Sequence, residues 1–159
     1  MKIFGKSLSE YLHFQRAILG LVLVVGIARL GLSLAGVSND VVKWLSLTAL
    51  AVVGVFYYAI RVHTTGFGSY RHMLPLLVNQ NLLAGAIIIV GLVIAITTGQ
   101  DNIFSAPEFS GGQDGKTWFH AVAHAVVAVV ASAGLWLVGS LIHFITRKVT
   151  PGTAAATAA

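Results

Sequence analysis

Four long apolar segments, separated by short polar ones, form the main pattern of hydrophobic and polar positions along the chain. They cover about residues 16–36, 41–62, 73–98 and 117–147. Because a helix rises about 1.5 Å per residue, each segment is long enough to cross a hydrocarbon layer about 30 Å thick. The pattern therefore predicts an all-α integral membrane protein in which residues 1–150 form one up-down-up-down four-helix bundle.

The polar residues between these segments predict where the helices begin and end. Residues 38–40 predict a tight connection in which Asn39 or Asp40 caps the second helix. Gly99 is expected to end the third helix, since glycine readily adopts the left-handed conformation that closes a helix. Thr117 is expected to cap the fourth helix with its hydroxyl group.

Three other segments are not predicted to cross the membrane. Residues 1–15 are basic and mildly amphipathic, which is typical of a segment that lies on the membrane surface. Residues 101–116 contain one proline and three glycines, so they predict a loop, and we expect it to be an ordered extracytoplasmic loop. The tail 151–159 is small and polar, and we expect it to be disordered.

The composition agrees with lipid as the solvent. Hydrophobic residues make up 57% of the chain and charged residues only 9%, whereas a soluble domain carries about 25% charged residues. The chain has no cysteine, which excludes disulfides, thiolate metal ligands and a cysteine nucleophile. Any metal ion would be held by imidazole, carboxylate or carbonyl groups.

The distribution of basic residues predicts the orientation in the membrane. Four spans place both termini on one side, and seven basic residues fall on that side against three on the other. The first set is Lys2, Lys6, Arg16, Arg61, Arg71, Arg147 and Lys148, and the second is Arg29, Lys43 and Lys116. Because cytoplasmic loops are enriched in Lys and Arg, we expect a multi-pass protein of a bacterial inner membrane with cytoplasmic N- and C-termini. Basic residues at helix ends indicate contact with the lipid bilayer and no nucleic-acid partner.

Small residues predict where the helices approach one another closely. We expect Gly20 and Gly31 in the first helix, and Gly85 and Gly91 in the third, to lie at helix–helix contacts. Such contacts serve packing within one chain and self-association equally well, so a homo-oligomer or a partner in a membrane complex stays open.

The first candidate site lies at the start of the fourth helix. His120 and His124 are four residues apart and therefore share one helix face. Together with Glu108, or with Asp114, they form the two-histidine and one-carboxylate ligand set that binds catalytic zinc or non-haem iron. The alternative is a pair of interfacial histidines that are hydrogen-bonded to the preceding loop.

The second candidate is Arg29, which falls inside the first span. A charge at that depth is costly and usually has a partner inside the bundle. Asp101, Glu108 and Asp114 lie on the same side of the membrane, so an ion pair that fixes the loop is one interpretation. An anion or lipid head-group site is the second, because a guanidinium group binds phosphate and carboxylate well. Snorkelling to the surface is the third.

A third cluster lies at the opposite ends of the helices. It consists of four histidines and a run of three amides, namely His13, His63, His72, His143 and residues 79–81. Histidines on facing helices of a four-helix bundle can bind haem b. The alternative is interfacial histidines and interhelical amide hydrogen bonds. Three consecutive amides cannot all face the same neighbouring helix.

Several functions are disfavoured by what the sequence lacks. No carboxylate lies within a predicted span, so proton-coupled antiport is not expected, and no glycine-rich phosphate loop is present. An enzyme with His120 and His124 as metal ligands and Glu108 as general base would need a substrate that no motif identifies. We therefore expect a non-enzymatic binding or accessory protein with a polar site at the extracytoplasmic end for a divalent metal ion (Zn or Fe) or a small ligand. The alternatives are a haem b redox protein and a structural subunit of a larger membrane complex.

Overall fold

The computed structural model describes residues 2–150 and is built from four long helices. They are α1 (Leu8–Leu34), α3 (Leu47–Thr64), α4 (Tyr70–Thr98) and α5 (Trp118–Val149). Together with the short helix α2 (Asn39–Val42), which precedes α3, they give four segments long and apolar enough to cross a membrane. The prediction of an all-α protein with four such segments is confirmed. The predicted disordered tail lies outside the described residues.

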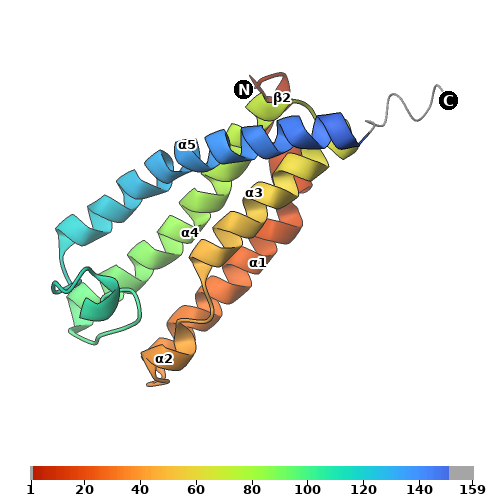
Figure 1. Ribbon diagram of the computed structural model, residues 1–159. Helices are drawn as coiled ribbons and strands as arrows, with labels where there is room; N and C mark the ends of the chain where they lie inside the picture. Colours follow the sequence, from red (N-terminus) through yellow and green to blue (C-terminus); the bar gives the residue numbers. More distant parts are fainter. Residues whose placement is uncertain (1, 151–159) are drawn as a thin grey trace.

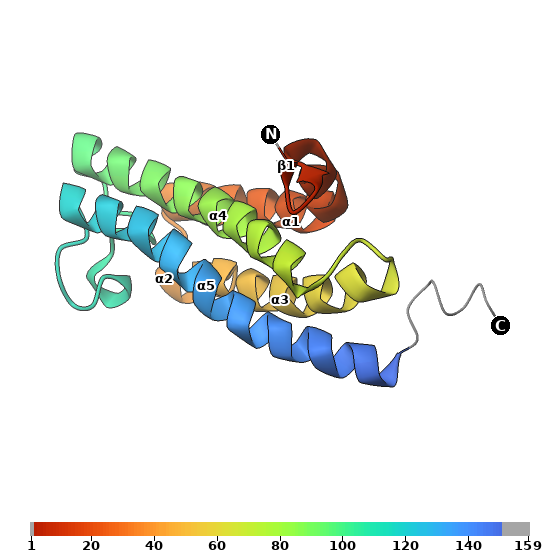
Figure 2. The same ribbon diagram turned by 90° about the horizontal axis from the view of Figure 1, so that it is seen from above.

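The four long helices lie side by side, with the shorter elements gathered at their two ends (Figures 1 and 2). At one end are α2 and residues 99–117, including the 3₁₀ turn η1 (Pro107–Phe109). We call this the connection end. At the other end, the hairpin end, are strands β1 (Lys2–Ile3) and β2 (Lys6–Ser7) and the last turns of α5. The most extensive helix contacts are those of α5 with α4, followed by α3 with α5 and α1 with α4.

The N-terminal segment, which we expect to lie on the membrane surface, begins with a short β-hairpin and continues into helix α1. Strands β1 and β2 pair antiparallel, and Phe4 and Gly5 turn the chain between them with φ of 50° and 86°. Helix α1 then begins at Leu8 because Ser7 and Glu10 form a capping box. The Ser7 amide donates to the Glu10 carboxylate at 2.7 Å, and the Glu10 amide donates to the Ser7 hydroxyl at 3.3 Å.

The second predicted span is interrupted, and its two parts are capped by serines. Ser38 caps α2, so the prediction that Asn39 or Asp40 would do so is wrong. The helix stops after Val42, and α3 begins only after Ser46, whose hydroxyl accepts from the Ala49 amide at 3.1 Å. We call residues 43–46 the break. Because a serine hydroxyl satisfies an otherwise unpaired amide at a new helix start, Ser46 explains why the helix restarts there.

The ends of the third and fourth long helices agree with the sequence prediction. Gly99 ends α4 with a φ of 74°, and Thr117 caps α5 by accepting from the His120 amide at 3.1 Å. Helix α4 begins at Tyr70, slightly before the predicted residue 73.

Close packing depends on some of the predicted glycines and on others that the pattern did not select. A Cβ at Gly85 would lie 3.2 Å from Ala128 Cβ, and one at Gly91 would lie 2.6 Å from the Phe104 ring. Gly20 and Gly31 have open space around them, so the prediction that they lie at helix contacts is wrong for contacts within the chain. In α1 this role belongs to Gly26, where a Cβ would lie 2.6 Å from the Ile87 side chain.

A layer of polar side chains connects the helices inside the bundle. Asn81 donates to the Ser132 hydroxyl of α5 at 2.9 Å, whereas the neighbouring Gln80 donates to the Leu50 carbonyl of α3 at 2.8 Å. Successive amides of α4 thus point to different helices, as the helical spacing requires. Asn79 is half-buried, and its Nδ2 has no hydrogen-bond partner.

Candidate functional site

The two histidines at the start of α5 form a direct pair. Their Nε2 atoms lie 3.0 Å apart and their rings are stacked, with centroids 4.8 Å apart. The Nδ1 atom of His120 lies 3.1 Å from the Gly115 carbonyl oxygen. A carbonyl only accepts, so Nδ1 of His120 carries the proton and donates to it, and its Nε2 is left as an acceptor for Nε2–H of His124. The capped start of α5 and the close approach of Gly115 therefore orient both rings.

The carboxylates of the connection have other partners. Glu108 accepts from the Asn39 side chain at 2.9 Å, and Asp114 accepts from the Lys116 amide at 2.9 Å. Within residues 2–150, no group of three or more His, Asp or Glu side chains is placed to hold a metal ion. The structure thus brings His120 and His124 together and places Glu108 and Asp114 in other interactions.

These hydrogen bonds also shift the pKa values of side chains at the connection end. The hydrogen bond from Asn39 lowers the pKa of Glu108 from its ordinary value. Asp101 accepts a charged hydrogen bond from Lys116 Nζ at 2.9 Å, and this bond raises the pKa of Lys116. The carboxylates of Asp101 and Glu108 are exposed to solvent and Lys116 is partly exposed, so these interactions contribute little stability.

Arg29 is half-buried in α1 and has only neutral neighbours. Its Nη1 donates to the Leu45 carbonyl of the break at 3.0 Å, and its Cζ lies 5.4 Å from the centre of the Phe104 ring. Its Nε is buried and has no hydrogen-bond partner. The ion pairs found in the described part of the chain are Lys6–Glu10, Lys43–Asp40 and Lys116–Asp101, so none involves Arg29.

Three of the four histidines at the hairpin end lie within hydrogen-bond distance of backbone carbonyls, namely His63, His72 and His143. His63 and His143 pack edge to face with ring centroids 5.8 Å apart. His143 Nδ1 lies 3.2 Å from the Ala59 carbonyl, and His63 Nε2 lies 2.9 Å from the Thr150 carbonyl. His72 accepts from the Ser69 amide at 3.0 Å and contacts the Phe4 carbonyl at 3.1 Å, so it attaches the hairpin to α4.

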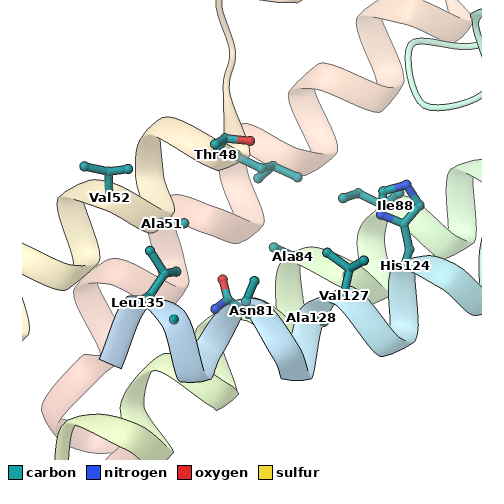
Figure 3. A pocket seen from close by; sticks show the side chains of 14 residues that line it. Thr48, Ala51, Val52, Asn81, Ala84, Ile88, His124, Val127, Ala128 and Leu135 are labelled. Atoms are coloured by element: carbon teal, nitrogen blue, oxygen red, sulfur yellow. The ribbon is translucent and has the colours of Figure 1, made fainter. Parts of the chain in front are cut away.

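A groove between α3, α4 and α5 is a feature that the sequence did not predict. It has a volume of about 480 Å³, and Figure 3 shows its walls. Helix α3 contributes Thr48, Ala51 and Val52, and helix α5 contributes residues from His124 to Leu135. The lining side chains are apolar except those of Thr48, Asn81 and His124.

The groove arises because α5 lies against α3 at the hairpin end and away from it toward the connection end. Gly139 of α5 lies so close to α3 that a Cβ there would be 3.3 Å from Val55 Cγ1. Nearer the connection end, the small side chains of Ala128 and Ala131 leave the space unfilled. Their small size is visible in the sequence, but the same pattern equally predicts close packing, so the groove could not be inferred from it.

Fold and site together define a class: a bundle of four helical segments long and apolar enough to cross a membrane, with an apolar groove beside a histidine pair. No protein-family model matches the chain, and neither a curated protein nor a solved structure matches it. The functional argument therefore depends on the geometry of this chain alone.

Proposed function

We propose that this protein is a non-enzymatic membrane binding protein whose ligand is an amphiphilic molecule with an uncharged head group. The observation that carries this proposal is the apolar groove of about 480 Å³ with His124 at one end and Asn81 inside it. Ligand sites are typically concave, mostly apolar and supplied with a few polar groups that fix orientation. The groove has this character.

The polar groups of the groove select the head group. Thr48, Asn81 and His124 are neutral hydrogen-bonding side chains, and no charged side chain lines the groove. Asn81 uses Nδ2 to bond Ser132, and Figure 3 shows its amide facing the space between α3 and α5. Its Oδ1 is then available to accept from a ligand hydroxyl group. A charged head would lose its hydration without a compensating partner, so a hydroxyl-bearing head fits best.

The arrangement of charges supports an orientation for this site. The hairpin end carries seven Lys and Arg residues and one carboxylate, which gives 7 − 1 = +6, and the connection end carries three and four, which gives 3 − 4 = −1. The positive-inside rule therefore favours cytoplasmic termini, an up-down-up-down path and an ordered extracytoplasmic connection. A bacterial inner membrane fits this arrangement. The ligand head would then face the outer leaflet.

A groove-filling variant tests the proposal. Ala131→Trp places a large side chain in the groove, and Ala133→Trp, on the same helix and outside the lining set, is the matched control. The probe is a fluorescent monoacylglycerol, titrated into protein in detergent. We expect saturable one-to-one binding to the wild type and to Ala133→Trp, and at least tenfold weaker binding to Ala131→Trp. Equal binding to all three proteins would refute the groove as the site.

The histidine pair favours a second candidate function, retention of a divalent metal ion. Two nitrogens bound at about 2.0–2.1 Å to one tetrahedral zinc ion lie roughly 3.3 Å apart, close to the observed 3.0 Å between the Nε2 atoms. The Gly115 carbonyl orients His120 in the way that outer partners orient metal-binding histidines. Two protein ligands leave the remaining positions to water or to the ligand head group.

Elemental analysis and an absorption spectrum of untagged protein test this candidate and haem b together. The metal hypothesis predicts stoichiometric zinc or iron that is lost in the His120→Ala/His124→Ala double variant and kept in His13→Ala, which changes an exposed histidine at the hairpin end. Unchanged metal content in the double variant would exclude the pair as ligands. A Soret band would instead support haem b, and co-purified proteins would support a structural subunit.

A further inference from the structure

Arg29 is a cation without a counter-charge at the edge of the membrane-spanning region. We propose that its guanidinium group binds the phosphate of a phospholipid head group at the connection end of the bundle. This site is separate from the groove and does not depend on the proposed function.

The depth of Arg29 follows from helix α3. Its 18 residues give a length of about 27 Å, close to the thickness of the hydrocarbon layer. The break before α3 therefore lies at the level of the head groups. Trp44 in the break is 81% exposed, as expected for an aromatic side chain of the membrane interface. Arg29 donates to Leu45 in this same break, so it lies at the same level.

The surroundings of Arg29 leave its charge uncompensated. Each carboxylate at the connection end has another partner: Asp40 pairs with Lys43, Asp101 with Lys116, Glu108 with Asn39, and Asp114 with the Lys116 amide. Arg29 contacts only a carbonyl and the Phe104 ring. A half-buried charge in this position is costly unless a partner neutralises it.

The guanidinium group is held in place and retains free donors. Phe104 reaches Arg29 because Gly91 of α4 has no side chain: a Cβ there would lie 2.6 Å from the Phe104 ring. The ring contact and the bond to Leu45 fix the side chain, and only one of its five N–H groups is used. Two N–H groups of a guanidinium match two oxygens of a phosphate, which a lysine ammonium group cannot do.

The test measures lipid binding to the whole protein by native mass spectrometry in detergent. The probes are phosphatidylglycerol, phosphatidylcholine and diacylglycerol, the last of which has no phosphate. We expect the wild type to bind both phospholipids at least tenfold more tightly than diacylglycerol. Arg29→Gln should lose this preference, and Arg29→Lys should keep part of it. Arg16→Gln, an exposed arginine on the same helix at the hairpin end, is the matched control and should retain it.

Competition with inorganic phosphate distinguishes recognition of a free phosphate ion from recognition of a phospholipid. Displacement of the lipid by millimolar phosphate would show that the anion alone is recognised, and resistance to it would show that the acyl chains contribute. Either result supports phosphate recognition by Arg29. Equal binding of diacylglycerol and phospholipid to the wild type, or unchanged preference in Arg29→Gln, would overturn the proposal. The wild-type comparison can still overturn the proposal if Arg29→Gln does not fold, and the weaker preference expected of Arg29→Lys then assigns the phosphate to Arg29.

Discussion

The contact between Gly54 of α3 and Gln80 of α4 predicts a large effect for a single added methyl group. A Cβ at Gly54 would lie 2.7 Å from Gln80 Nε2 and 2.8 Å from its Cδ, and closer still to Oε1. Real Cβ atoms do not approach other atoms this closely. Because the clashing atoms end a flexible side chain, the amide would swing away in Gly54→Ala and leave the backbone in place.

The cost follows from what the amide loses. Gln80 is 1% exposed, and its Nε2 bond to the Leu50 carbonyl at 2.8 Å would break. A buried donor that loses its partner costs about 1–3 kcal/mol, which already includes the lost hydrogen bond. The higher helix propensity of alanine offsets about 1 kcal/mol of this cost. We expect Gly54→Ala to lower the free energy of unfolding by about 0–2 kcal/mol.

Reversible unfolding in mixed micelles, followed by circular dichroism while dodecyl sulfate is titrated in, measures this change. Gly20→Ala is the control because its Cβ would meet nothing within 4 Å, so it should be neutral or stabilising by up to about 1 kcal/mol. Gln80→Ala removes the amide that would clash. The double variant Gly54→Ala/Gln80→Ala should therefore be more stable, by about 1 kcal/mol or more, than the sum of the two single changes in unfolding free energy predicts. The reasoning is refuted if Gly54→Ala is as stable as Gly20→Ala.

Three further predictions concern hydrogen bonds at helix ends and interfaces. Ser132→Ala should lower unfolding free energy by about 0.5–2 kcal/mol in the same assay, because Asn81 loses its partner on α5. Thr117→Ala should lower the free energy of unfolding by about 0.5–2 kcal/mol, because α5 loses its cap, whereas Thr117→Ser should keep most of the stability. Equal stability of the two variants would contradict a role of the hydroxyl group as the cap. Glu108 should titrate below its ordinary pKa by NMR, and Asn39→Ala should raise that midpoint. Since the folded pKa is lowered, the stabilisation from this bond is present above the unfolded pKa and is lost as pH falls through the folded one; an unshifted midpoint in Asn39→Ala would contradict it.

The long helices were predictable because their signal is length and apolarity, which the sequence shows directly. The ends at Gly99 and Thr117 were predictable because each depends on a local preference of one residue type. The break at residues 43–46 was not predictable, because Lys43 and Ser46 are isolated polar residues within a mainly apolar segment. At Ser46 the chain can either continue a helix or cap a new one, and the hydropathy of the segment is the same in both cases.

The candidate site was predictable only where the contacts are local. The contact between His120 and His124 follows from their spacing of four residues. The partners of Glu108 and Arg29 do not follow from sequence spacing. Asn39 and Leu45 come from other elements, whose approach depends on the break. The groove depends on the angle between α3 and α5, and no residue pattern in either helix encodes that angle.

Helix α5 lies close to α3 near the hairpin end and diverges from it toward the connection end. Gly139 and His143 meet Val55 and Ala59 near the hairpin end, whereas the groove lies further along toward His124. From residue 139 to residue 124 is 15 residues, or about 22 Å of helix. A rotation of about 5° around the contact would move His124 by roughly 2 Å, several times more than it moves any atom near the pivot. The width of the groove mouth therefore depends strongly on the angle between α3 and α5.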